Sequence, residues 1–182
     1  GRVQAGQNVL IIGASGGVGT FALQIAKAFG AEVTGVCSTA KMDPVHSIGA
    51  DHVIDYMRED FADGQHSYDV IVDIGGNHRL SHLRRALTPR GRLVIVGGET
   101  GGRWLDGTDR LLRAYLLSPL VSQKLGGFIA SENTADLRVL RDLIESGKIT
   151  PAIDETYPLS QTPAAIRHVQ EGRARGKVVI TI

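Results

Sequence analysis

A glycine-rich segment between an apolar run and an amphipathic stretch constrains the fold of this chain most strongly. Residues 9–12 are apolar, residues 13–19 read Gly-Ala-Ser-Gly-Gly-Val-Gly, and apolar residues then recur at helical spacing from Val18 to Phe29. In such a strand–turn–helix unit, Gly13 allows the tight turn, Gly16 lets the backbone approach a pyrophosphate, and Gly19 lets the helix pack on the strand. Free N–H groups at the helix start face the anion. The segment therefore predicts a dinucleotide-binding unit.

Further short apolar runs alternate with helical patterns along the chain. The runs lie at residues 33–36, 52–54, 70–72 and 93–96, with a sixth strand expected at 126–130. Helices are expected at residues 41–48, 79–87 and 110–125, the last interrupted at Pro119. Continuous apolar runs are typical of strands buried on both faces, and their alternation with helices implies right-handed crossovers. We expect an α/β fold with a six-stranded parallel sheet that helices cover on both sides.

The last part of the chain differs in pattern from the rest. A helix over residues 134–145, capped by Asn133 or Thr134, precedes an extended stretch at 156–159, a helix at 162–171 and a strand at 177–182. The terminal strand has no obvious neighbour in a six-stranded sheet. We therefore divide the chain into a nucleotide-binding domain, residues 1–150, and a C-terminal extension, residues 151–182.

Composition excludes several classes of function. Lysine and arginine number 20 against 19 aspartates and glutamates, a net charge of +1, which gives no electrostatic footprint for nucleic acid or an anionic membrane. No apolar run approaches the ~18 residues of a membrane span, and no signal peptide is recognisable, so we expect a cytoplasmic protein. One cysteine forms neither an internal disulfide nor a thiolate zinc cluster, and we expect no metal site.

The end of the second strand indicates which cofactor binds. NAD sites usually place an Asp or Glu there to accept from the ribose 2′-hydroxyl. This chain has Ser38, Thr39 and Lys41 after Cys37, and no acidic residue before Asp43. Hydroxyl groups and an ammonium suit a 2′-phosphate, so NADP(H) is favoured over NAD(H).

A second register of the glycine loop, from Gly13 through Gly17 to Gly19, would suit the short-chain dehydrogenases. Their catalytic pair is Tyr-x-x-x-Lys, which the sequence itself can test. The residues four positions after the four tyrosines are Asp60, Val72, Pro119 and Gln161. None is lysine, so the catalysis of that family is absent.

Four other positions are weaker candidates for chemistry. His78 and His82 have the spacing of metal ligands on one helix face, but we read this segment as a solvated basic helix. Cys37 ends a buried strand and is interpreted as a small core residue rather than a nucleophile. Asp73 either approaches the ligand cleft or hydrogen-bonds a turn.

Three strings, VLIIGASGGVGTFALQIAKAFGAEVTGVCST, SIGADHVIDY and GKVVITI, resemble the zinc-independent quinone-oxidoreductase branch of the medium-chain dehydrogenase/reductases. The resemblance covers essentially the whole chain. It implies a Rossmann-type doubly wound sheet with a short C-terminal strand–helix–strand extension and NADPH bound across the strand ends. It also implies hydride transfer from the nicotinamide to quinones, enones or similar activated double bonds.

The resemblance also implies where the cofactor would bind. Its phosphate loop corresponds to Ser15, Gly16, Gly17 and Val18, and its 2′-phosphate contacts correspond to Ser38 and Lys41, with Tyr56 beside them. The turns that border the ribose and nicotinamide correspond to Ile74, Gly75, Val96, Gly97 and Gly98, and Phe128 lies in the region that lines the nicotinamide pocket.

Members of this family also have an N-terminal substrate domain, which does not precede Gly1. We therefore expect the chain to be a piece of a longer enzyme and to be inactive alone, with residues 151–182 packing on the substrate domain. An enoyl-reductase module of a multidomain synthase and a non-catalytic NADP-sensing module remain alternatives. Residues 126–130 would supply a sheet edge for a homodimer, or an edge protected by other contacts in a monomer.

Overall fold

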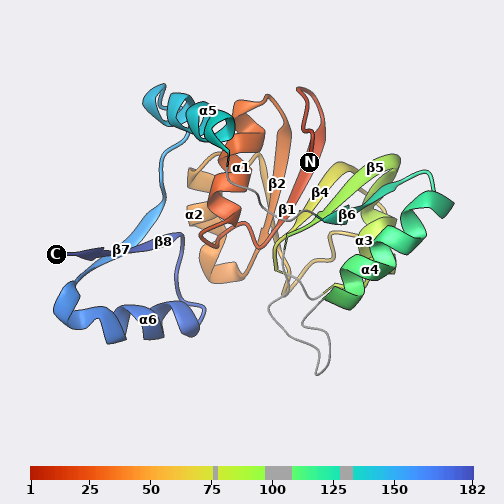
Figure 1. Ribbon diagram of the computed structural model, residues 1–182. Coiled ribbons are helices and arrows are strands. Elements are labelled where there is room, and N and C mark those ends of the chain that lie inside the picture. The colour runs from red at the N-terminus through yellow and green to blue at the C-terminus, as the bar shows by residue number, and fades with distance from the viewer. Residues whose placement is uncertain (76–77, 97–107, 128–132) are drawn as a thin grey trace.

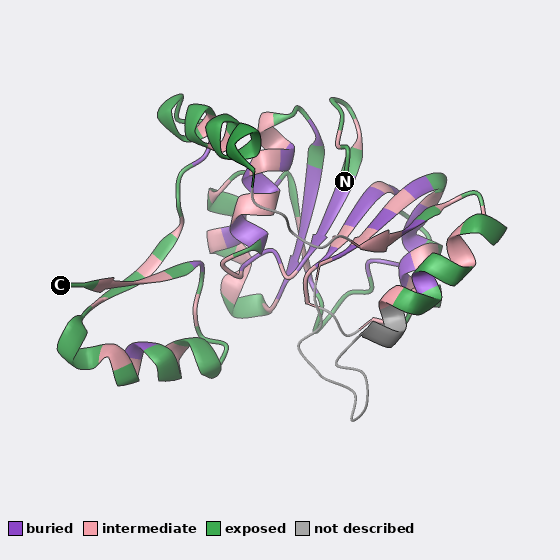
Figure 2. Ribbon diagram, viewed as in Figure 1, coloured by how far each residue is buried: buried purple, intermediate pink, exposed green. Residues whose placement is uncertain are grey.

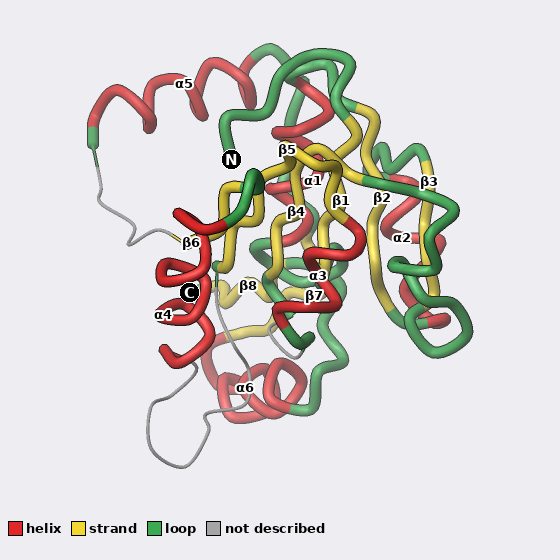
Figure 3. The backbone as a smooth tube through the Cα atoms, turned by 90° about the vertical axis from the view of Figure 1, so that its right-hand side faces the viewer, coloured by secondary structure: helices red, strands yellow, loops and turns green. Residues whose placement is uncertain are grey.

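The computed structural model describes residues 1–75, 78–96, 108–127 and 133–182. Six parallel strands form one sheet in the order β3-β2-β1-β4-β5-β6, which Figure 3 shows from β3 on the right to β6 on the left. The strands are β1 (Asn8–Ile12), β2 (Glu32–Cys37), β3 (His52–Asp55), β4 (Tyr68–Asp73), β5 (Leu87–Ile95) and β6 (Lys124–Gly127). This strand order is that of the doubly wound dinucleotide-binding fold, so the predicted fold class is confirmed.

Helices cover both faces of the sheet (Figure 1). On one face lie α1 (Gly19–Ala28) and α2 (Met42–Ser47), and on the other lie α3 (Leu80–Ala86) and α4 (Thr108–Leu117). A short 3-10 helix, η1 (Thr39–Lys41), links β2 to α2. None of the helices in the described ranges has the length and apolar character needed to cross a membrane.

The core consists of two apolar layers, one on each side of the sheet. Successive side chains of a strand point to opposite faces, so Val9 and Ile11 of β1 join the cluster under α1 and α2. Leu10 and Ile12 join the cluster under α3 and α4. Figure 2 shows the central strands as the most buried part of the molecule. An apolar run without alternation is therefore buried along its whole length.

The structure corrects two predicted boundaries. The helix expected over 110–125 ends at Leu117, and η2 (Ser118–Leu120) and then β6 follow it. Pro119 explains the end, because proline has no N–H and its ring clashes with a continuing helix. Strand β5 begins at Leu87 rather than at residue 93, with a register shift opposite β4 that accommodates Pro89 and Gly91. The expected strand residues 128–130 lie outside the described part of the chain.

The C-terminal segment begins with α5 (Thr134–Glu145), where the Asn133 side chain accepts from the N–H of Asp136 at 2.8 Å and is therefore the helix cap. The extension itself contains β7 (Ile153–Pro158), η3 (Leu159–Gln161), α6 (Thr162–Gln170) and β8 (Lys177–Thr181). Strands β7 and β8 form a separate two-stranded parallel sheet. Within the described residues, the terminal strand thus has no neighbour in the six-stranded sheet, as expected, and its partner is β7, which begins earlier than the extended stretch expected at 156–159.

Candidate functional site

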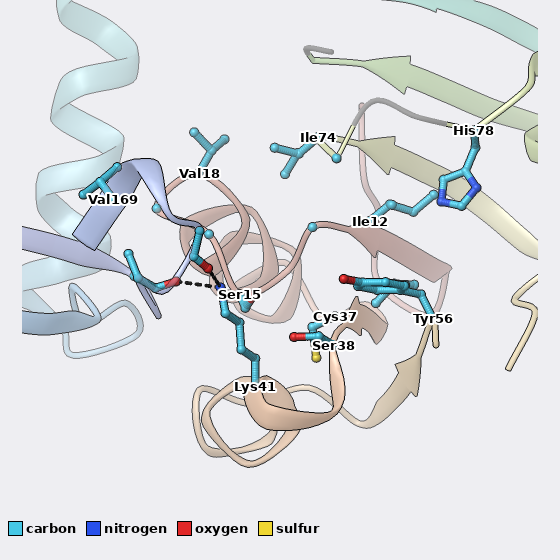
Figure 4. Close-up of a pocket in the computed structure, with 18 residues that line it drawn as sticks. Ile12, Ser15, Val18, Cys37, Ser38, Lys41, Tyr56, Ile74, His78 and Val169 are labelled. Atoms are coloured by element: carbon cyan, nitrogen blue, oxygen red, sulfur yellow. Dashed lines mark hydrogen bonds between the residues drawn. The ribbon is translucent and has the colours of Figure 1, made fainter. Parts of the chain in front are cut away.

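A cleft of about 670 Å³ opens at the carboxyl ends of the central strands (Figure 4). Ile12 and Gly13 border it from the end of β1, Ser38 from the end of β2, and Ile74 and Gly75 from the end of β4. In open α/β sheets, ligands bind outside the carboxyl ends of the strands at the point where the strand order reverses. That point lies between β1 and β4 in this sheet, so the cleft has the position and volume of a ligand site.

The loop after β1 has the geometry that a phosphate-binding turn requires. Gly13 has φ of +85°, and a Cβ at this position would lie 3.1 Å from the backbone nitrogen of Gly75. A Cβ at Gly19 would lie 2.1 Å from the carbonyl oxygen of Gly13. The start of helix α1 therefore packs closely against the end of β1, and the predicted role of Gly19 in this packing is confirmed. Its positive N-terminal end is directed at the cleft.

Three polar residues border the cleft beyond β2 and β3. They are Ser38, Lys41 and Tyr56, which the sequence assigned to the 2′-phosphate region. Figure 4 shows the Lys41 side chain reaching toward the C-terminal extension. Its ammonium donates to the carbonyl oxygens of Gly172 and Ala174 at 2.7 and 2.9 Å. Lys41 is therefore held in place at the cleft rather than extended into solvent.

A buried carboxylate supports this part of the cleft. Asp55, at the end of β3, accepts from the hydroxyl of Thr39 and from the N–H of Met57, the latter at 3.0 Å. The bond from Thr39, together with that from Met57 and the charge of Arg58, holds the pKa of Asp55 below its usual range despite burial. Asp55 thus stays ionised and fixes the η1 segment that carries Lys41.

Cys37 is buried at the end of β2. Burial, reinforced by the carboxylate of Asp55, raises the pKa of the Cys37 thiol to about 11. The thiol therefore stays protonated at neutral pH, and Cys37 is a core residue, as expected, rather than a nucleophile. Asp73 is also fully buried and does not border the cleft.

His78 borders the cleft, which the sequence did not predict. Its ring stacks on His82 at a centroid distance of 5.5 Å, and Phe61 meets both rings edge-on at 4.9 and 4.8 Å. His82 also lies 2.9 Å from the carboxylate of Asp60. The interpretation of a solvated basic helix is therefore wrong, because both imidazoles pack against an aromatic ring. Within the described ranges, no three His, Cys, Asp or Glu side chains are grouped as metal ligands, so these residues do not fit a zinc site.

The extension contributes further residues that sequence reasoning missed. Val169, Gly172, Ala174 and Gly176 border the same cleft. They are apolar or glycine residues far along the chain from the glycine loop, so no pattern in the sequence marks them as part of the site.

Most of the predicted site positions surround this one cleft. Nine of them border it, namely Ser15, Gly16, Gly17, Val18, Ser38, Lys41, Tyr56, Ile74 and Gly75. Val96 follows β5, where its N–H donates to the carbonyl of Asp73 at 3.0 Å, and it does not border the cleft. Gly97, Gly98 and Phe128 lie outside the described residues.

Comparison with known proteins identifies the family. A family model described as zinc-binding dehydrogenase matches residues 48–180. The chain belongs to the zinc-binding dehydrogenase family. A relative from Mus musculus, the mitochondrial NAD(P)H oxidoreductase RTN4IP1, is 36% identical over 97% of this chain and 48% of its own length.

Two further similar proteins are also matched over about half of their own length. The chloroplastic NADPH-dependent alkenal/one oxidoreductase of Arabidopsis thaliana is 30% identical over 97% of this chain and 41% of its own. The solved structure of the quinone oxidoreductase from Coxiella burnetii superimposes with a TM-score of 0.80 at 27% identity, over 100% of this chain and 54% of that one. The chain thus spans about half the length of these relatives.

Proposed function

We propose that this chain is the cofactor-binding domain of an NADPH-dependent oxidoreductase that transfers hydride to quinones, enones or similar activated double bonds. One observation carries the proposal. The glycine loop, the N-terminus of α1 and the Ser38–Lys41 turn all border a single cleft at the carboxyl ends of the parallel strands. The names of the relatives, which include NAD(P)H and quinone oxidoreductases, support the same class of reaction.

The residues of this chain bind and orient the cofactor. When bound, the reduced nicotinamide supplies the hydride, so the protein needs no nucleophile of its own. The N–H groups at the start of α1 bind the pyrophosphate, and Gly16 leaves room for its approach. Ile74 and Gly75 border the ribose, while Val96, Gly97, Gly98 and Phe128 remain predictions for the nicotinamide side.

NADPH is proposed over NADH because of the charges around the end of β2. Lys41 offers an ammonium and Ser38 a hydroxyl to a 2′-phosphate. The nearest buried carboxylate, Asp55, is engaged by Thr39 and Met57 rather than free to accept from a ribose hydroxyl.

The activity is tested with the full-length protein that contains this chain, because half of the relatives' length lies outside it. NADPH oxidation is followed at 340 nm with a quinone, an enone and a 2-enoyl thioester as acceptors. We expect turnover with a quinone or enone. Turnover confined to the thioester would favour the enoyl-reductase module. Tight NADPH binding without turnover of any acceptor would favour the sensing module.

Three finer points complete the proposal. Residues 1–150 and 151–182 are proposed as separate units, the second packing on a substrate domain. The edge strand β6 is proposed as a homodimer contact. A cytoplasmic location is also proposed. The mouse relative carries a mitochondrial name, so subcellular fractionation is the relevant test.

A further inference from the structure

The turn between α6 and β8, residues 171–176, holds the far end of the Lys41 side chain. Gly172 and Ala174 of this turn border the cleft, and their carbonyl oxygens accept from the Lys41 ammonium. Figure 4 draws both bonds at the ammonium nitrogen. Asp55 fixes the segment that carries Lys41, as described above, so the two ends of this side chain are held by different parts of the fold.

A lysine held in this way is prepared to bind an anion. A lysine side chain loses conformational entropy when a ligand orders it, and two backbone carbonyls have already ordered Lys41. An ammonium has three N–H donors, so one remains for a phosphate oxygen while both carbonyls stay bound. None of the ion pairs among the described residues includes Lys41. Its positive charge is therefore available, in the part of the chain that the structure describes, for an anion in the cleft.

A buried pair of side chains joins the elements on either side of the turn. The His168 side chain, near the end of α6, donates from Nε2 to a carboxylate oxygen of Asp154, on β7, at 2.7 Å. Both side chains are largely buried, with 13% and 15% of their surface exposed. Burial alone raises the pKa of Asp154, but the hydrogen bonds from His168 and from the backbone N–H of Arg175 outweigh it and hold the pKa below its usual range. One ionised carboxylate therefore connects β7 with α6 and with the end of the turn.

Neither Asp154 nor His168 borders the cleft, so the pair does not act on a ligand by direct contact. Burying polar side chains costs desolvation that an apolar contact would avoid, whereas a hydrogen bond sets a defined distance and direction. A pair of this kind is suited to hold the turn at one position. The carbonyls of Gly172 and Ala174, which belong to the turn, are held in place with it.

We propose that Asp154 and His168 are positioning residues for cofactor selectivity. They hold the turn so that its two carbonyls keep the Lys41 ammonium where the 2′-phosphate of NADPH binds. The proposal rests on the proposed function, in which Lys41 faces that phosphate. Selectivity for NADPH over NADH then depends on the C-terminal extension as well as on the residues that follow β2.

Asp154→Ala, in the full-length protein that contains this chain, removes the carboxylate that joins the turn to its neighbours. In calorimetric titrations we expect the Kd of NADPH to rise about fivefold and that of NADH to change less than about twofold, because NADH has no phosphate for Lys41. Asp154→Asn keeps an oxygen that accepts from His168 and should retain most of the selectivity. Asp142→Ala removes an exposed carboxylate outside the cleft and is the matched control. If Asp154→Ala does not fold, His168→Phe, which keeps a ring but lacks the N–H, carries the same expectation.

A double-mutant cycle tests whether the pair acts through Lys41. In the Lys41→Ala background, Asp154→Ala should cause no further loss of NADPH affinity. Additive losses would overturn the proposal, as would equal losses for NADPH and NADH in Asp154→Ala alone. Wild-type affinity for both cofactors, with only the melting temperature lowered, would overturn it in favour of a purely structural pair. A wild type that does not prefer NADPH, or a Lys41→Ala protein that loses affinity for both cofactors equally, would instead contradict the proposed assignment of Lys41.

Discussion

Two glycines of the loop after β1 differ in what a side chain would meet there. A Cβ on Gly19 would lie 2.1 Å from the carbonyl oxygen of Gly13, whereas a Cβ on Gly16 would meet nothing closer than 3.6 Å. Gly19 is therefore required by the packing of α1 on β1, whereas no contact within the described protein requires glycine at position 16, where we propose that the pyrophosphate approaches the backbone. The same sequence motif thus combines a structural requirement with a proposed functional one.

The pair Gly19→Ala and Gly16→Ala separates these requirements. We expect Gly19→Ala to lower the free energy of unfolding by about 1–3 kcal/mol, because the backbone at the start of α1 must move away from the backbone at Gly13. Gly16→Ala should change it by less than about 0.5 kcal/mol and still weaken NADPH binding at least about tenfold. Urea unfolding and calorimetric titration of both variants measure this. A Gly16→Ala protein that binds NADPH normally would show that no phosphate approaches this position.

Among the elements, the short segment η1 is held by β3, a strand that follows both η1 and the glycine loop in the sequence. Asp55 of β3 holds Thr39 of η1 through an ionised carboxylate whose pKa is lowered in the folded state. A lowered folded pKa stabilises the protein above the unfolded pKa of about 3.9, and this stabilisation is lost as the pH falls through and below that value. The position of Lys41 is thus linked to the charge of Asp55.

Asp55→Asn should therefore lower the free energy of unfolding at pH 7, and the difference from the wild type should shrink as the pH falls to 3. Urea unfolding at pH 7, 5 and 3 measures this difference. Asp142→Asn, which removes an exposed carboxylate paired with Arg141, is the matched control. A difference that stays constant over this pH range would contradict a stabilising charge on Asp55.

The elements that the sequence predicted well are those determined by local pattern. Strands β1 and β2 follow from continuous apolar runs, and helix α1 follows from apolar residues at helical spacing that end at Gly30. The start of β5 was missed because Pro89 and Gly91 look like a turn, yet the register shift opposite β4 accommodates them. The pairing of β7 with β8 was missed because it depends on packing across an intervening helix, which no short stretch of sequence encodes.

At the scale of the whole molecule, side chains near the glycine loop hold the C-terminal part of the chain by hydrogen bonds from Gln24 to Thr150 and from Lys41 to Gly172 and Ala174. Gln24 fixes the chain immediately before residues 151–182, since both hydrogen-bonding groups of its buried amide are paired with the backbone of Thr150. Removing this side chain removes two hydrogen bonds to the backbone of Thr150, and a typical intramolecular hydrogen bond contributes about 0.5–1.5 kcal/mol.

Gln24→Ala should therefore loosen the extension more than it changes the sheet. We expect faster amide hydrogen exchange across residues 151–182, with exchange in β1 and β4 little changed. Gln170→Ala, on an exposed position of α6, is the control. Equal acceleration in the sheet and in the extension would indicate a general loss of stability and contradict a local attachment.

The candidate site could be predicted only in part from the sequence, because some of its residues come together through contacts between distant parts of the chain. The glycine loop, Ser38 and Lys41 were found because they follow strands β1 and β2 directly. The contact of Lys41 with Gly172 joins residues 131 positions apart, and the contact of Lys177 with Gly17 is comparably distant in sequence. Such contacts depend on how the chain folds back, so sequence patterns did not reveal the contribution of the extension.

NADPH selectivity through Lys41 is tested by one set of titrations, with NADPH and NADH each added to the wild type and to Lys41→Ala. The wild type should bind NADPH more tightly than NADH. Lys41→Ala should lose about tenfold or more in NADPH affinity, because a hydrogen bond to a charged group is worth about 1.5–3 kcal/mol. Its NADH affinity should be nearly unchanged, since NADH has no 2′-phosphate. Equal losses for the two cofactors would contradict the assignment of Lys41 to the 2′-phosphate.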